Sequence, residues 1–118
     1  MAGKDRLFLL PAGFEDPALD SGGRGWFCPG CAMVEGFLGY HPQVRDHLEV
    51  IYHPYPRPRE AIVALVGEAH QGMPVLVLAE PFDHVDVRRA DSGVWFVADE
   101  KPITRYLAAR WGVSAPHP

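Results

Sequence analysis

Residues 25–31 read Gly-Trp-Phe-Cys-Pro-Gly-Cys, and they contain both cysteines of this 118-residue chain. A helical pattern begins here, because apolar residues recur at three-to-four spacing over residues 33–40. If Cys28 and Cys31 lie in the first turn of a helix, their side chains are neighbours that a disulfide can join. The first thiol also lies at the positive end of the helix dipole, which favours a negative charge there. The stretch therefore predicts a reactive dithiol.

Composition and charge indicate one globular domain over residues 1–118, with a structured core at residues 6–111. The chain is 47% hydrophobic and 22% charged, and its length suffices for one sizeable core. A net charge of −4 without a long Lys/Arg run argues against a nucleic-acid partner. Residues 7–10 form an apolar run too short for a signal peptide or a membrane span. We therefore expect a cytoplasmic protein with no membrane partner.

Hydrophobic periodicity predicts the secondary structure of the rest of the chain. Strands are expected at residues 6–10, 48–52, 73–79 and 94–97, the last as a hairpin with residues 85–87. Helices are expected at residues 28–40, 42–47, 58–70 and 99–111, and a long loop at residues 11–25. The first two strands, joined through a helix, predict a parallel pair, and the last two predict an antiparallel pair. The result is an α/β fold with a four-stranded mixed sheet and helices on both faces.

Three segments share a known pattern. In residues 27–31 a proline directly follows the first cysteine, and in residues 72–76 a proline opens a buried strand. In residues 99–107 an acidic pair opens a helix that ends in Tyr-Leu. Together they resemble the thioredoxin-like superfamily, in its glutaredoxin and glutathione-transferase N-terminal branch. The resemblance covers residues 6–111 and points to a bacterial family of unassigned function.

The resemblance implies a thiol-disulfide oxidoreductase. Cys28 would attack a disulfide, and Cys31 would resolve the mixed disulfide that results. Pro74 in the cis form would bring the backbone of Met73 beside the sulfurs, where it offers hydrogen bonds to a peptide or to glutathione. A trans proline that simply opens a strand is the alternative at this position.

Four further residues are candidates for substrate binding. Asp99 and Glu100 would hold the γ-glutamyl group of glutathione, and helix capping is the alternative role. Trp26 and Phe27 would form walls of the site, and core packing is the alternative. The partner is then glutathione or a protein disulfide, with glutathione as a co-substrate and no resident cofactor or metal.

Two other classes of function remain open. One is a thioredoxin-like binding module whose dithiol does not turn over. The other is a small zinc protein that uses Cys28, Cys31, His41 and His47. The nine residues between the second cysteine and the first histidine are short for a small zinc finger, and Pro42 interrupts a helix carrying both histidines. We therefore expect no metal.

Overall fold

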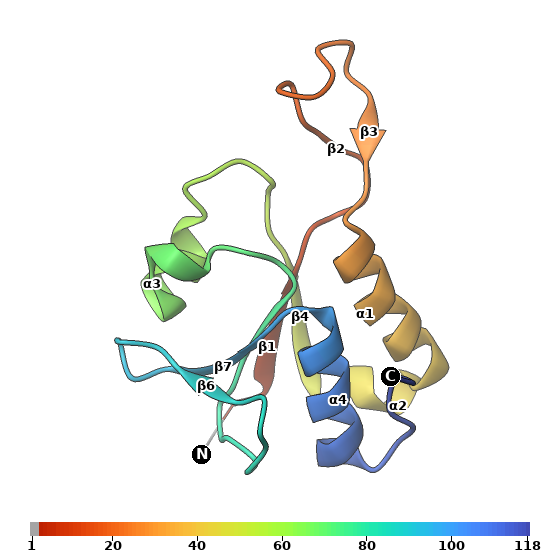
Figure 1. Cartoon of the computed structure of the whole chain (residues 1–118), viewed down its shortest axis with the longest axis vertical. Helices are drawn as coiled ribbons and strands as arrows, with labels where there is room; N and C mark the ends of the chain where they lie inside the picture. Colours follow the sequence, from red (N-terminus) through yellow and green to blue (C-terminus); the bar gives the residue numbers. More distant parts are fainter. Residues whose placement is uncertain (1–2) are drawn as a thin grey trace.

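The chain forms a five-stranded mixed sheet (Figure 1). The computed structural model describes residues 3–118. The strands in spatial order are β4 (Leu48–Tyr52), β1 (Asp5–Leu9), β5 (Val75–Val77), β7 (Trp95–Ala98) and β6 (Arg88–Arg89). The helices are α1 (Pro29–Tyr40), α2 (Pro42–Arg45), α3 (Glu60–Val66), the short 3-10 helix η1 (Glu68–His70) and α4 (Glu100–Trp111). Within residues 3–118, none of these helices has the length and apolar character needed to cross a membrane.

The strand directions follow the predicted order. β1 pairs in parallel with β4, and α1 and α2 form the connection between them. β5 pairs antiparallel with β1, and β7 pairs antiparallel with β5. All three residues of β5 are buried, as expected for a strand with neighbours on both sides. The α/β class and the mixed sheet are therefore confirmed.

The sheet has five strands, so the prediction of four was wrong. The additional strand β6 pairs antiparallel with β7 and places Arg88 opposite Phe96 and Arg89 opposite Trp95. The guanidinium of Arg88 lies 5.2 Å from the ring centroid of Phe96, and that of Arg89 lies 5.0 Å from that of Trp95. Such cation–π contacts hold the strand without buried aliphatic residues. Two adjacent arginines show no alternation of apolar and polar residues, so the sequence pattern did not indicate a strand here. It placed the hairpin partner of residues 94–97 at residues 85–87 instead.

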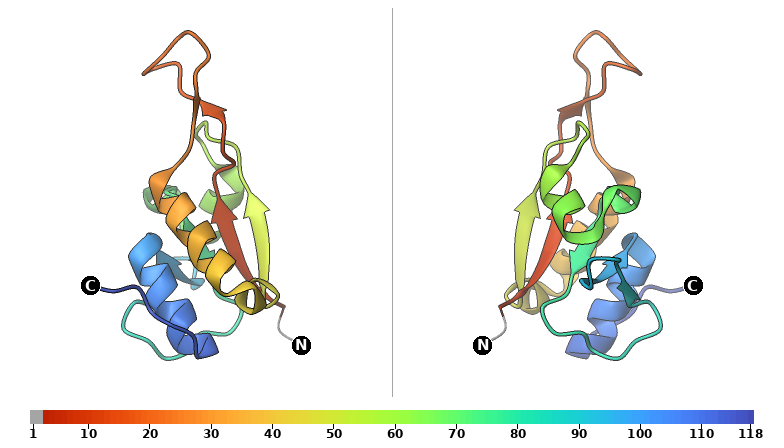
Figure 2. Two further views of the ribbon diagram at one scale, coloured as in Figure 1. Left: turned by 90° about the vertical axis from the view of Figure 1, so that its right-hand side faces the viewer. Right: turned by 90° about the vertical axis from the view of Figure 1, so that its left-hand side faces the viewer.

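Alternating side chains of the strands face two hydrophobic layers. Leu7, Leu9 and Leu76 pack with residues of α1, α2 and α4. Phe8 and Val75 point the other way and pack with residues of α3. In Figure 2, α1 and α4 lie in front of the sheet in the left view and α3 lies in front in the right view. Helices therefore cover both faces, as predicted.

Two segments differ from their predicted form. The helix expected over residues 58–70 divides into α3 and η1 at Gly67, whose φ of 93° no regular helix accommodates. The loop expected over residues 11–25 contains a hairpin, in which β2 (Phe14–Glu15) pairs antiparallel with β3 (Gly25–Trp26). This hairpin projects beyond the sheet at the top of Figure 1 and leads directly into α1.

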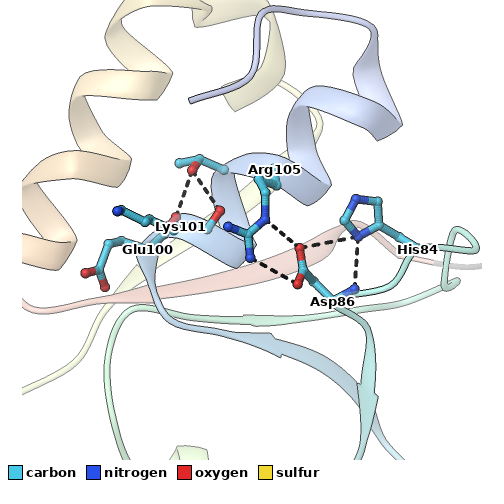
Figure 3. A network of polar contacts seen from close by, with 6 residues as sticks. His84, Asp86, Glu100, Lys101 and Arg105 are labelled. Atoms are coloured by element: carbon cyan, nitrogen blue, oxygen red, sulfur yellow. Dashed lines mark hydrogen bonds and ion pairs between the residues drawn. The ribbon is translucent and has the colours of Figure 1, made fainter. Parts of the chain in front are cut away.

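The segment between β5 and β6 is fixed to α4 by an ion pair, shown in Figure 3. Nε and Nη2 of Arg105 donate to the carboxylate of Asp86 at 2.9 and 3.1 Å, and this contact holds the pKa of Asp86 below its ordinary value. Nδ1 of His84 lies 3.6 Å from the same carboxylate. One turn into α4, the hydroxyl of Thr104 donates to the carbonyl of Glu100 at 2.8 Å. These contacts hold α4 in place, and its first residues approach the cysteines.

The stability of the sheet can be tested at Leu76, which is fully buried. Leu76→Ala is expected to lower the free energy of unfolding by about 2–5 kcal/mol, because the alanine leaves a cavity between β5 and the helices. Leu19 in the hairpin is 72% exposed, and Leu19→Ala is expected to change the same quantity by less than about 0.5 kcal/mol. Urea denaturation followed by circular dichroism measures both. Equal losses in the two variants would contradict the assigned core.

Candidate active site

Cys28 is the N-cap residue of α1, and Pro29 occupies the first helical position, where its missing N–H costs nothing. The Sγ atom of Cys28 accepts a hydrogen bond from the N–H of Cys31 at 3.2 Å. An N-cap side chain ordinarily satisfies one of the free N–H groups in this way. The sulfur of Cys28 is therefore directed at the N–H groups and at the positive end of the helix dipole.

Cys31 lies in a different environment. It is 3% exposed, and its Sγ accepts a hydrogen bond from the N–H of Leu10 at 3.4 Å. Burial raises the pKa of Cys31 to about 12; the bond from Leu10 opposes the rise, and the neighbouring Cys28 adds to it. Both cysteines carry free thiols. Cys31 therefore stays protonated at neutral pH, whereas Cys28 is the partly exposed thiol of the pair.

Met73 and Pro74 lie against the dithiol. The Met73–Pro74 peptide bond is cis, as the resemblance implied. The carbonyl oxygen of Met73 lies 3.8 Å from the Sγ of Cys28 and accepts a long hydrogen bond from this thiol. Since β5 begins at Val75, the carbonyl stands at the entrance to a central strand. The structure thus brings Met73 and Cys28 together across 45 positions of sequence.

The start of α4 lies beside the same turn. The N–H of Asp99 donates to the carbonyl of Pro74 at 3.4 Å. A Cβ atom at Gly30 would come within 2.7 Å of Oε2 of Glu100 and within 3.3 Å of Cδ of Pro74. The glycine in the dithiol motif therefore lets α4 approach α1 closely. Asp99 and Glu100 therefore lie next to Pro74 and Gly30 respectively, close to the dithiol turn.

Asp99 has an unusual backbone. Its φ of 74° is positive, and within residues 3–118 every other residue with a positive φ is a glycine. With ψ at 153°, this conformation costs a residue with a side chain on the order of 1–3 kcal/mol. Its side chain makes no capping hydrogen bond to α4 in the described part of the chain. The exposed carboxylate of Asp99 therefore does not serve the capping role considered for it.

The structure separates the two aromatic residues predicted to wall the site. Phe27 is 64% exposed and, with Cys28 and Cys31, lines a pocket of about 260 Å³. Trp26 is not among the residues that line this pocket. Its ring lies 5.4 Å from the guanidinium carbon of Arg24, and its indole N–H is buried without a partner in the described residues. Of the two aromatic residues, only Phe27 lines this pocket.

The pocket also contains side chains that the sequence analysis did not single out. They are Leu10, Ala12, Ala32 and Glu35. Burial favours the neutral acid of Glu35, but bonds from the hydroxyl of Tyr52 at 2.6 Å and from Arg45 at 2.9 Å outweigh it and lower the pKa of Glu35. Glu35 follows Cys31 by four residues, so the spacing already placed the two on one helix face.

A larger cavity of about 450 Å³ lies apart from the cysteines, between α1, α4 and the C-terminal residues. Its lining includes Phe37, Tyr40 and Pro116. In it, Nε2 of His41 and Oγ of Ser114 form a hydrogen bond of 2.8 Å. The smaller pocket is the better candidate for the site, because it contains the dithiol.

The zinc alternative finds no support in the geometry. His41 bonds to Ser114, and the ring of His47 stacks on Trp111 with centroids 3.6 Å apart. Within residues 3–118, no three side chains of His, Cys, Asp or Glu gather as a metal ion requires. The structure therefore does not bring the two histidines to the two cysteines.

The raised pKa of Cys31 predicts a loss of stability at alkaline pH. The unfolded thiol titrates near 9.0 and the folded thiol near 12, so the unfolded state loses its proton first. The free energy of unfolding is then expected to fall as the pH rises from about 9 toward 12. In Cys31→Ala the fall between about pH 8 and 10.5 should be shallower, as measured by urea denaturation under reducing conditions.

The control is Cys28→Ala, which keeps the buried thiol and is expected to keep the steeper fall. Identical pH dependence in the unchanged protein and in Cys31→Ala would contradict the assignment. Tyr106, whose pKa is also raised by burial, contributes equally to all three proteins and cancels in the comparison.

Comparison with known proteins adds a family. A family model described as "Protein of unknown function (DUF3088)" matches residues 4–115, which include both cysteines, Met73, Pro74 and Asp99. Searches of curated proteins and of solved structures found no match. The match covers nearly the whole chain, and the protein therefore belongs to the DUF3088 family.

Proposed function

We propose that the protein is a thiol-disulfide oxidoreductase of thioredoxin-like fold, with Cys28 as the nucleophile and Cys31 as the resolving thiol. The position of Cys28 carries this proposal: its sulfur lies at the start of α1, 3.2 Å from the N–H of Cys31 and 3.8 Å from the carbonyl oxygen of Met73. A partly exposed thiol at a helix N-terminus, one turn before a buried thiol, suits thiol–disulfide exchange.

The strand order supports the thioredoxin-like assignment. Apart from the edge strand β6, the sheet runs β4-β1-β5-β7, with a parallel first pair connected through α1 and an antiparallel last pair. The dithiol begins the helix that follows β1, the cis proline precedes β5, and the acidic pair begins α4. These three places are the ones on which the sequence resemblance rests.

The proposed reaction has two exchange steps. The thiolate of Cys28 attacks one sulfur of a substrate disulfide, the substrate S–S bond breaks, and the released thiolate takes up a proton. Cys31 then loses its proton to solvent and attacks the Sγ of Cys28, which releases the second substrate thiol. The substrate gains two electrons and the protein is left with a Cys28–Cys31 disulfide. Two molecules of a thiol such as glutathione would reduce that disulfide again.

The oxidoreductase proposal is tested with glutathione as the redox buffer. The reduced protein is expected to equilibrate with mixtures of reduced and oxidised glutathione and to form the Cys28–Cys31 disulfide. In Cys31→Ser, exchange is expected to stop at a mixed disulfide of Cys28 with glutathione, which adds one glutathione to the intact mass. Cys28→Ser is the matched control and is expected to form no adduct. If neither the disulfide nor the adduct forms, the oxidoreductase proposal is contradicted, and the alternative of a binding module without catalytic turnover is favoured.

Two features of the site bear on the substrate. The backbone N–H of Asp99 bonds to the carbonyl of Pro74, and the exposed carboxylate of Asp99 can pair with an ammonium group, as the γ-glutamyl end of glutathione requires. The exposed ring of Phe27 offers an apolar contact, which a protein disulfide would also use. We propose glutathione as the first substrate to test, with a protein disulfide as the alternative.

Calorimetry separates these two substrates. Glutathione is expected to bind weakly to the reduced protein, and Asp99→Lys is expected to weaken binding by about tenfold or more, because it repels the ammonium group and adds positive charge at the N-terminus of α4. Asp91→Lys makes the same charge change at an exposed turn and should leave binding unchanged. No heat at millimolar glutathione would discard glutathione and favour protein disulfides. Equal effects of the two lysine variants would exclude the assigned role of Asp99.

A further inference from the structure

Arg59, at the start of α3, is a buried arginine. It is 4% exposed, although arginine is rarely this buried without a carboxylate partner. Its Nε and Nη2 donate to the carbonyl of Tyr55 at 3.0 and 2.8 Å, and its Nη1 donates to the carbonyl of Gln71 at 2.8 Å. Both acceptors are neutral. Within residues 3–118 none of the ion pairs includes Arg59, so its positive charge is not neutralised.

These bonds connect Arg59 to the strand entrance beside the dithiol. Its backbone N–H donates to Oε1 of Gln71 at 2.8 Å, in addition to the side-chain bond to the Gln71 carbonyl. Gln71 lies two residues before Met73, whose carbonyl accepts the hydrogen bond from Cys28. Arg59 therefore holds, at two points, the segment that presents Met73 to the reactive sulfur.

Arg59 also supports the hairpin that leads to Cys28. Its guanidinium carbon lies 5.4 Å from the ring centroid of Tyr55. That ring stacks on Phe14 of β2, with centroids 4.5 Å apart and planes within 7° of parallel. Tyr55 and Phe14 pack against the same hydrophobic core as Cys28 and Met73. The buried side chain of Arg59 is thus connected, through Tyr55 and Phe14, to the hydrophobic core that the dithiol contacts.

The two cysteines are among the groups that influence the pKa of Arg59. Burial lowers the pKa of Arg59 and the neighbouring Arg57 lowers it further, whereas Tyr55 and the anionic forms of Cys31 and Cys28 oppose the fall. An arginine remains charged under such conditions. Because a Coulomb interaction is mutual, an ionised thiol that stabilises the guanidinium is stabilised by it in return.

Negatively charged groups also lie around the dithiol, and they include Asp99, the exposed N-cap residue of α4. Glu35 on α1 lines the pocket, and the carboxylate of Glu100 on α4 lies against Gly30 of the motif. These carboxylates disfavour a nearby thiolate, and Arg45 pairs with Glu35 at 2.9 Å. Arg59 supplies positive charge from a third element, the start of α3.

We propose that Arg59 is a positioning residue of the dithiol, whose buried positive charge stabilises the thiolate of Cys28 and so favours the reduced form of the protein. This inference rests on the proposed thiol–disulfide exchange and favours the reverse of the reaction written there, in which the disulfide form accepts electrons. When the disulfide form oxidises a substrate dithiol, a substrate thiolate attacks Cys28, the Cys28–Cys31 bond breaks, and Cys31 leaves and takes up a proton. The second substrate thiolate then attacks the first substrate sulfur, and Cys28 leaves as a thiolate. A stabilised thiolate leaves faster, and the protein becomes a stronger oxidant.

The test uses proteins in which Cys31→Ser leaves Cys28 as the single thiol. Arg59→Met removes the buried charge and keeps an apolar stem, whereas Arg57→Met removes the charge of an exposed neighbour. The rate of iodoacetamide alkylation is measured across about pH 5 to 9. Arg59→Met is expected to slow alkylation at neutral pH about tenfold and to move the profile about one unit to higher pH. Arg57→Met is expected to change the rate by less than about twofold.

Arg59→Lys separates charge from structure, because it keeps the charge and loses the planar fork. Its pH profile is expected to stay close to that of the unchanged protein. An equal displacement in Arg59→Lys and Arg59→Met would overturn the inference, since it would report only the loss of the hydrogen bonds. Arg59→Gln is a second neutral variant for use if Arg59→Met does not fold by circular dichroism. An unchanged profile in a folded neutral variant would also overturn the inference.

With Cys31 restored, the same variants are equilibrated with reduced and oxidised glutathione. Loss of the charge is expected to shift the equilibrium toward the protein disulfide by about tenfold. No shift would refute the claim that Arg59 favours the reduced form. If the unchanged protein does not react with glutathione, the proposed function is refuted. The alkylation experiment involves no thiol–disulfide exchange, so it would still decide whether Arg59 stabilises the thiolate of Cys28.

Discussion

The antiparallel pairing of β1 with β5, which places Leu7 opposite Leu76, is the constraint on which the site depends. The end of β1 and the start of β5 lie at the same edge of the sheet. Just beyond that edge, the N–H of Leu10 bonds to the sulfur of Cys31, and the carbonyl of Met73 bonds to the thiol of Cys28. Both sulfurs are therefore positioned by backbone groups of the two central strands. A one-residue slip in this pair would exchange its buried faces and displace both contacts.

The helices complete the arrangement by bringing charge to the sulfurs. The start of α1 directs an N–H group at Cys28, while the start of α4 brings Glu100 against Gly30 of the same turn. α4 can approach this closely because position 30 has no side chain. The ion pair of Arg105 with Asp86 fixes α4 from its outer side. The surroundings of the dithiol are thus assembled from four elements, each fixed by contacts of its own.

Much of this architecture could be predicted from the sequence, since the strongest patterns lie in buried elements. The aliphatic run over residues 75–77 predicted β5, and the apolar stripe of residues 33–40 predicted α1. The three-residue spacing of Cys28 and Cys31 predicted that both lie at the start of that helix. Other features leave no periodic signal. β6 is held by arginines over aromatic rings, and Gly67 divides a helix whose apolar stripe continues past it. The burial of Arg59 depends on the backbone carbonyls of Tyr55 and Gln71, on either side of it in the chain, and such contacts leave no periodic pattern in the sequence.

The two cysteines of the motif lie only three residues apart, but their thiols have different surroundings: Cys31 is buried, whereas Cys28 is partly exposed. Burial keeps Cys31 protonated, which suits the resolving role that we propose for it. The N–H of Cys31 donates to the sulfur of Cys28, and in our proposal the charge of Arg59, which no ion pair within residues 3–118 includes, also favours a negative sulfur. A positive charge acts over a longer range inside a protein than in water, because the interior screens it less. In the proposed role, Arg59 acts on the dithiol without touching it, and removing its charge is therefore expected to change the reactivity of Cys28 while every hydrogen bond of the sulfur is retained.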